Sequence, residues 1–151
     1  MITSEQIRQM VEENIAGTEK FIVDVSVNPG NRIVVEIDSP QGVNISDCTT
    51  IHRFIESKLD RNVEDFELTV SSPGLEEPFK ILKQYQKNLG RKVRVVQKTG
   101  IVSEGELSKA NEDEIVVTQE IKEKINGKKQ RSIKLLNISF DKIKATKLII
   151  A

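Results

Sequence analysis

The stretch FIVDVSVNPGNRIVVEID, residues 21–38, contains two runs in which apolar and polar side chains alternate. Alternation with a period of two predicts a β-strand with one buried face, here over 21–27 and again over 32–38. Between the two runs, Asn28-Pro29-Gly30-Asn31 supplies the residue types that favour turns. This stretch therefore predicts a β-hairpin.

Two amphipathic helices and a third strand are predicted around this hairpin. The first helix follows a capping-box pattern, Thr3-x-x-Gln6, and the second is expected to begin with Ser46 as its N-cap. A strand is predicted over 66–71. The apolar stripes of the two helices are Ile7, Met10, Val11 and Ile15 in the first and Cys48, Ile51, Ile55 and Leu59 in the second.

The order of these elements predicts an α+β domain over residues 1–80. Two helices cover one face of a three-stranded sheet, whose last two strands are parallel because a helix connects them. Residues 81–90 are predicted to be a linker with a short helix, and 91–151 a small SH3-like or Sm-like all-β barrel. The barrel strands are expected over 91–98, 101–107, 114–121, 132–136 and 145–150.

Composition excludes several classes of function. With 37% hydrophobic and 30% charged residues over 151 positions, the chain is expected to fold as a cytoplasmic protein without a membrane span. Cys48 is the only cysteine and His52 the only histidine, which excludes a multi-cysteine metal cage, and we expect no cofactor or metal. The chain has no Trp, few other aromatic residues and no G-x-x-G, which argues against base stacking and against a KH domain.

The two signs of charge are separated along the chain. Residues 1–80 contain 7 Lys+Arg against 15 Asp+Glu, whereas residues 81–151 contain 16 against 8. A second half with a net charge of +8 is suited to phosphate backbones or acidic protein surfaces. The alternative is a basic surface that serves only solubility.

The most concentrated group of basic residues surrounds Asn126-Gly127, a pair typical of a type I′ hairpin turn. We expect it to contact phosphates, although a mobile, solvated loop would have the same composition. Glu120 and Glu123 are the only acids nearby. The basic candidates for contact with RNA or an acidic partner are Lys122, Lys124, Lys128, Lys129 and Arg131 at this turn, with Arg91, Lys92, Arg94 and Lys98 upstream.

Two acidic residues, Asp38 and Asp47, lie in a loop and at a helix start. With Ser71 they form the one arrangement that would suit a hydrolase, but capping and helix-dipole interactions explain such carboxylates better. Cys48 and His52 are one helical turn apart, and two ligands do not make a metal site. We therefore expect no catalytic residues.

The motif Ser71-Ser72-Pro73-Gly74-Leu75, with the strand FELTV before it, resembles the ribosome maturation factor RimP family. Residues 35–38 and 42–48 resemble the strand, acidic loop and helix start of that family, and Leu59-Asp60 its helix end. Pro73 and Gly74 also have the order of a type II turn. We expect this motif to hold the two domains in a fixed relation.

The resemblance implies a non-enzymatic assembly factor that binds the free small (30S) ribosomal subunit and assists its maturation. We expect the protein to be a monomer. It also implies an α+β domain followed by an SH3-like or Sm-like barrel that contacts a ribosomal protein near rRNA. The sequence departs from the family at Glu77, where an arginine is usual, so a contact made there is in doubt. The alternative function is a free-standing Sm-like RNA chaperone or regulator that assembles into rings.

Overall fold

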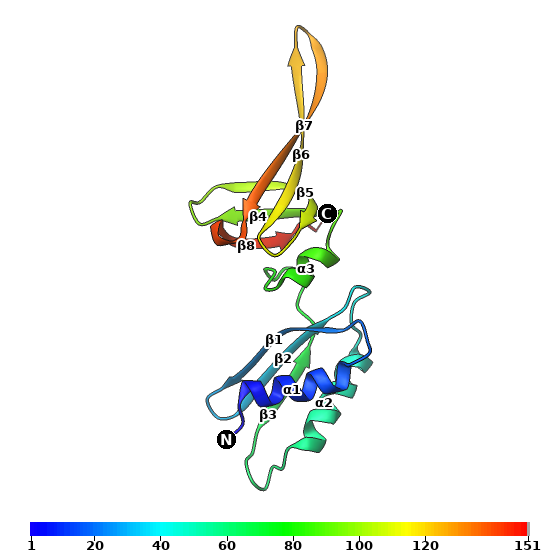
Figure 1. The fold of residues 1–151 in the computed structure, drawn as a ribbon, viewed down its shortest axis with the longest axis vertical. Helices are drawn as coiled ribbons and strands as arrows, with labels where there is room; N and C mark the ends of the chain where they lie inside the picture. Colours follow the sequence, from blue (N-terminus) through cyan, green and yellow to red (C-terminus); the bar gives the residue numbers. More distant parts are fainter. Residues whose placement is uncertain (151) are drawn as a thin grey trace. The chain divides into compact units, whose positions relative to one another are not determined.

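The computed structural model describes residues 1–150, which form two compact units, Met1–Gly74 and a second unit from Leu75 onward (Figure 1). The division predicted at residues 80 and 90 stays a prediction. No helix among residues 1–150 has the length and apolar character needed to cross a membrane.

The first unit has the predicted α-β-β-α-β order. It consists of α1 (Ser4–Ile15), β1 (Phe21–Asn28), β2 (Arg32–Asp38), α2 (Ile45–Lys58) and β3 (Glu67–Ser71). The sheet order is β1-β2-β3, with β1 and β2 antiparallel and β2 and β3 parallel, as the connecting helix predicted. The α+β fold class is thus confirmed for this part.

Both helices pack against one face of this sheet, as Figure 1 shows. The alternation in β1 and β2 and the stripes of the two helices meet in one core. Its fully buried members include Ile7, Val11, Ile33, Val35, Ile37, Ile51 and Ile55.

The two helices begin differently from each other. Thr3 caps α1 as predicted, and its hydroxyl accepts a hydrogen bond from the Gln6 amide at 3.1 Å. Ser46 as the cap of α2 was a wrong prediction, because the helix begins earlier. Asn44 is the N-cap, and it exchanges side-chain and backbone hydrogen bonds with Asp47, three residues on.

The second unit is a five-stranded antiparallel sheet with one short helix. Its order is β7-β6-β5-β4-β8, so β7 and β8 lie at opposite ends. Within residues 1–150 these two end strands share no ladder, so closure of the predicted barrel is not found. The elements are α3 (Leu82–Lys87), β4 (Lys92–Gln97), β5 (Val102–Ala110), β6 (Glu114–Ile125), β7 (Lys128–Ser139), the 3₁₀ helix Phe140–Lys142 and β8 (Ile143–Leu148).

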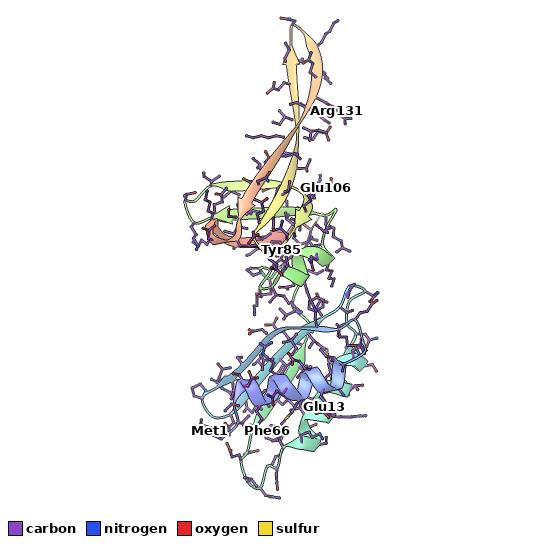
Figure 2. All side chains as sticks on the ribbon, viewed as in Figure 1. Met1, Glu13, Phe66, Tyr85, Glu106 and Arg131 are labelled. Carbon is purple, nitrogen blue, oxygen red and sulfur yellow. The ribbon has the colours of Figure 1, made fainter. Side chains whose placement is uncertain are left out.

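A single tyrosine connects α3 to the sheet. Tyr85, labelled in Figure 2 where α3 meets the sheet, is buried. Its hydroxyl donates a hydrogen bond of 2.8 Å to Oγ1 of Thr146 on β8. Its ring makes edge-to-face contacts with Phe79 and Phe140, at centroid distances of 5.0 and 5.2 Å. The core on which it packs contains Val93, Val95, Leu107, Ile115, Val117 and Ile138.

Candidate nucleic-acid interface

The hairpin of β6 and β7 extends beyond the rest of the second unit (Figure 1). The ladder between β5 and β6 ends at the pair Glu106 and Thr118, whereas β6 and β7 stay paired as far as Ile125 and Lys128. At the turn, Asn126 and Gly127 have φ angles of 51° and 78°. Two consecutive positive φ angles are those of a type I′ turn, so the predicted turn is confirmed.

Both strands of this hairpin are 12 residues long, which exceeds the predicted 114–121 and 132–136. The alternation of apolar and polar residues that predicts a strand is lost toward the tip, because neither face of the hairpin is buried there. The ladder nevertheless runs without a register shift from Glu114 to Ile125.

The strand register sorts the five basic residues of the tip onto two faces. Lys122 lies directly opposite Arg131, and Lys124 directly opposite Lys129. Paired residues of an antiparallel ladder share a face, as do residues two apart on one strand. These four cations therefore lie on one side of the hairpin, which we call the basic face. Lys128 is opposite Ile125 on the other side.

Like charges that are directly opposed across a ladder destabilise it. The basic face has two such pairs in succession, and one acid relieves them: Oε1 of Glu120 lies 2.6 Å from Nε of Arg131. On the opposite side, Glu123 is the acid next to Lys128 along the ladder, so that side of the tip is balanced. The hairpin thus holds its positive charge on one surface at a cost in intrinsic stability.

Two exposed apolar residues continue the basic face toward the sheet. Ile133 and Leu135 are 73% and 63% exposed, and they pair with Glu120 and Thr118. Their place on the basic face was not predicted from the sequence. It could have been, because a two-residue turn at 126–127 fixes which residues pair along the hairpin and therefore which side chains share a face.

The basic candidates upstream lie in a different electrostatic environment. Lys92 is directly opposite Glu106, and Arg94 is opposite Glu104, with Nε 3.9 Å from its Oε1. The guanidinium of Arg91 donates a hydrogen bond to Asn88. Cations and acids therefore alternate on this part of the sheet.

Lys98 lies in the exposed turn after β4. Its backbone amide donates a hydrogen bond to the Lys142 carbonyl at 2.8 Å. The structure does not join it to the basic face in one cluster, and its role in binding stays a prediction.

Asp47 and Asp38 have structural partners. The pKa of Asp47 is lowered below its ordinary value, mainly because its carboxylate accepts a hydrogen bond from the Asn44 backbone amide. The Lys20 ammonium, 3.2 Å from Oδ1, lowers this pKa further. Asp38 is buried, and its Oδ1 accepts the Ser39 amide at 2.9 Å. These bonds hold the start of α2 and the loop after β2.

Replacing Asp47 by asparagine is expected to make the first unit less sensitive to acid. Its lowered pKa means that the folded state favours the carboxylate, so the stabilisation is present above about pH 4 and is lost as pH falls below it. Melting temperatures followed by helical circular dichroism from pH 6 to pH 2 will show a shallower decline in Asp47→Asn. Glu12→Gln, which changes an exposed carboxylate on α1, is the control and keeps the wild-type profile.

A groove of about 440 Å³ lies in the first unit between α2 and the end of β3. Its lining includes Cys48, His52, Ser71 and Ser72. Both ring nitrogens of His52 already have partners, with Nδ1 2.9 Å from Glu56 and Nε2 3.1 Å from the Leu68 carbonyl. Burial raises the pKa of the Cys48 thiol, with a further increase from Asp47. This chemistry favours a structural role for His52 and an unreactive thiol.

No hydrogen-bonded turn is found at Pro73 and Gly74, and the expectation of a type II turn there stays a prediction. Ser71 ends β3 opposite Glu36, and the chain turns later, at Leu75 and Glu76. The role of Ser71, Ser72, Pro73, Gly74 and Leu75 in holding two domains together stays a prediction.

Comparison with known proteins agrees with this architecture. The family described as RimP N-terminal domain matches residues 4–76, which contain all five elements of the first unit. A protein of Porphyromonas gingivalis is 42% identical over 107 residues, which cover 71% of this chain and 70% of that protein. Proteins of Christiangramia forsetii (35% over 115 residues, 76% and 72%) and Flavobacterium psychrophilum (33% over 118 residues, 78% and 76%) are also similar.

The structure thus defines the class as a two-part α+β protein that carries a basic, solvent-exposed hairpin. All three relatives are described as ribosome maturation factor RimP. This chain belongs to the RimP family, which confirms the resemblance noted from its sequence.

Proposed function

We propose that this protein is a non-enzymatic ribosome maturation factor that binds the free small (30S) ribosomal subunit and assists its assembly. The observation that carries the proposal is its membership of the RimP family, with 42% identity to a ribosome maturation factor over 71% of the chain.

The distribution of charge supports a ribosomal partner. The first unit, residues 1–74, has 13 acidic and 6 basic side chains, whereas the basic residues gather in the second. We infer that the second unit lies toward rRNA, beside the ribosomal protein that it contacts. Because most of the attraction comes from phosphates, binding weakens steeply as salt rises. The proposal also places the protein in the cytoplasm as a monomer.

Co-sedimentation tests the proposal directly. The purified protein is expected to sediment with free small subunits and not with large subunits or intact ribosomes, and to be released between 50 and 200 mM salt. Equal association with all three particles would indicate general attraction to RNA. No association by a folded monomer would reject the proposed function, and a ring-sized species in gel filtration would favour the RNA-chaperone alternative.

A further inference from the structure

We infer that the basic face of the β6–β7 hairpin binds the phosphate backbone of RNA, while the opposite face of the same hairpin stays outside the contact. This inference rests on the proposed function in naming the ribosomal subunit as the source of that RNA. It assigns to one side of the hairpin a role that neither the family match over residues 4–76 nor the relatives' names assign.

The geometry provides two parallel rows of cations. Lys122 and Lys124 form the row on β6, and Arg131 and Lys129 the row on β7. On such a ladder, the Cα atoms of residues two apart along a strand are about 6.8 Å apart, and the Cβ atoms of directly opposed residues about 5 Å apart. A linear polyanion has charges repeated along a line and therefore meets several of these cations together.

The energetics favour a ligand at this site. The two opposed like-charge pairs lie on a two-stranded extension without strand neighbours beyond Thr118. Such an extension is intrinsically weak, and the repulsion weakens it further. A polyanion on the basic face converts that repulsion into attraction, so binding and order of the tip increase together.

The acids around the hairpin limit the contact to its outer part. Glu120 already pairs with Arg131, and the open groove at the root of the hairpin contains Glu104 and Glu106. Glu104 and Glu106 are directly opposite Arg94 and Lys92, so the charges at the root balance and offer phosphate no net attraction. The exposed Ile133 and Leu135 lie between root and tip on the same side, and an apolar surface of that kind favours a macromolecule over a free phosphate ion.

Two double variants with the same change in net charge separate the two faces. Lys124→Gln with Lys129→Gln removes the opposed pair nearest the turn, and Lys128→Gln with Lys134→Gln removes two exposed lysines of the other face. The first variant also removes a repulsion, so its hairpin is not expected to unfold. Lys124→Arg with Lys129→Arg keeps the charge and serves as the rescue.

Affinity for free small subunits is measured for the full chain between 50 and 300 mM salt. Affinity falls as salt rises, and the loss of two phosphate contacts makes the slope of log affinity against log salt less steep by about 2. At 0.1 M salt the variant is then expected to bind on the order of 100-fold more weakly than the wild type. The opposite-face and arginine variants are expected to keep the wild-type slope. Equal losses in the two glutamine variants, or none in either, would overturn the inference.

The same variants are measured on a short double-stranded RNA to separate this inference from the proposed function. If the protein binds this RNA through the basic face but does not bind small subunits, the RNA contact is upheld and the ribosomal role is rejected. Binding to small subunits that needs the basic face, without any binding to RNA, would identify an acidic protein surface as the partner and overturn the inference.

Discussion

Replacing Gly105 by alanine is expected to lower the free energy of unfolding of the second unit by about 3 kcal/mol. A Cβ at this position would lie 2.5 Å from the carbonyl oxygen of Thr118 and 2.8 Å from Cγ1 of Val117. The first neighbour is backbone and the second belongs to a fully buried side chain, so neither can move at low cost.

The close approach has a structural reason. Gly105 lies on β5 beside the place where β6 leaves the sheet and enters the hairpin. The Gln119 side chain donates a hydrogen bond of 3.1 Å to the Glu104 carbonyl at the same place. An alanine there pushes β6 away from β5, which also disturbs the root of the basic hairpin.

Unfolding of the second unit can be followed through Tyr85, the only tyrosine in a chain without tryptophan. Gly100→Ala is the control, because that glycine has φ 92° and open space around it, so the change costs about 1 kcal/mol through backbone strain alone. Denaturation midpoints that rank Gly105→Ala no lower than Gly100→Ala would show that β5 and β6 separate without cost.

Local sequence patterns predict the first unit well because its helices and strands contribute apolar side chains to one core. The alternation over 21–38 and the helical stripes point into one apolar layer, so pattern and burial agree. The start of α2 was misplaced by two residues, since Asn44 and Ser46 are both good caps. What selects Asn44 is its reciprocal bonding with Asp47, which geometry reveals more clearly than sequence.

The second unit was harder to predict because its distinguishing features do not depend on burial. The hairpin beyond Thr118 has no core to impose a pattern, so both strands were predicted too short. The five charges at its tip were recognised, but the sequence analysis did not extend the pairing outward from the turn at Asn126-Gly127, which divides them into four and one. Closure of a barrel depends on how strands curve, and alternation along single strands does not report it.

Replacing Tyr85 by alanine is expected to destabilise the second unit by about 3 to 5 kcal/mol, because removal of the buried ring leaves a cavity between α3 and the sheet. Tyr85→Phe keeps the ring and removes only the hydroxyl. Its expected cost is about 1 to 3 kcal/mol, since the fully buried hydroxyl of Thr146 loses its partner.

A double-mutant cycle distinguishes the hydrogen bond from the packing. Thr146→Val alone leaves the Tyr85 hydroxyl unpaired, whereas Tyr85→Phe with Thr146→Val removes both polar groups from one site. The double variant is therefore expected to be more stable than the sum of the single changes implies. Denaturant unfolding followed by far-ultraviolet circular dichroism measures all four proteins, and strict additivity would contradict a buried hydrogen bond.

The same tyrosine makes the second unit sensitive to alkali. Burial raises the pKa of Tyr85 above its ordinary value, and the bond to Thr146 offsets only part of that rise. Above about pH 10 the unfolded chain loses the phenolic proton first, so stability falls as pH rises toward the pKa of the folded state. Absorbance of the single phenolate reports this titration directly, and Tyr85→Phe is expected to remove the alkaline loss. A phenolate that appears at the ordinary pKa while the sheet stays folded would show that the ring is accessible to water.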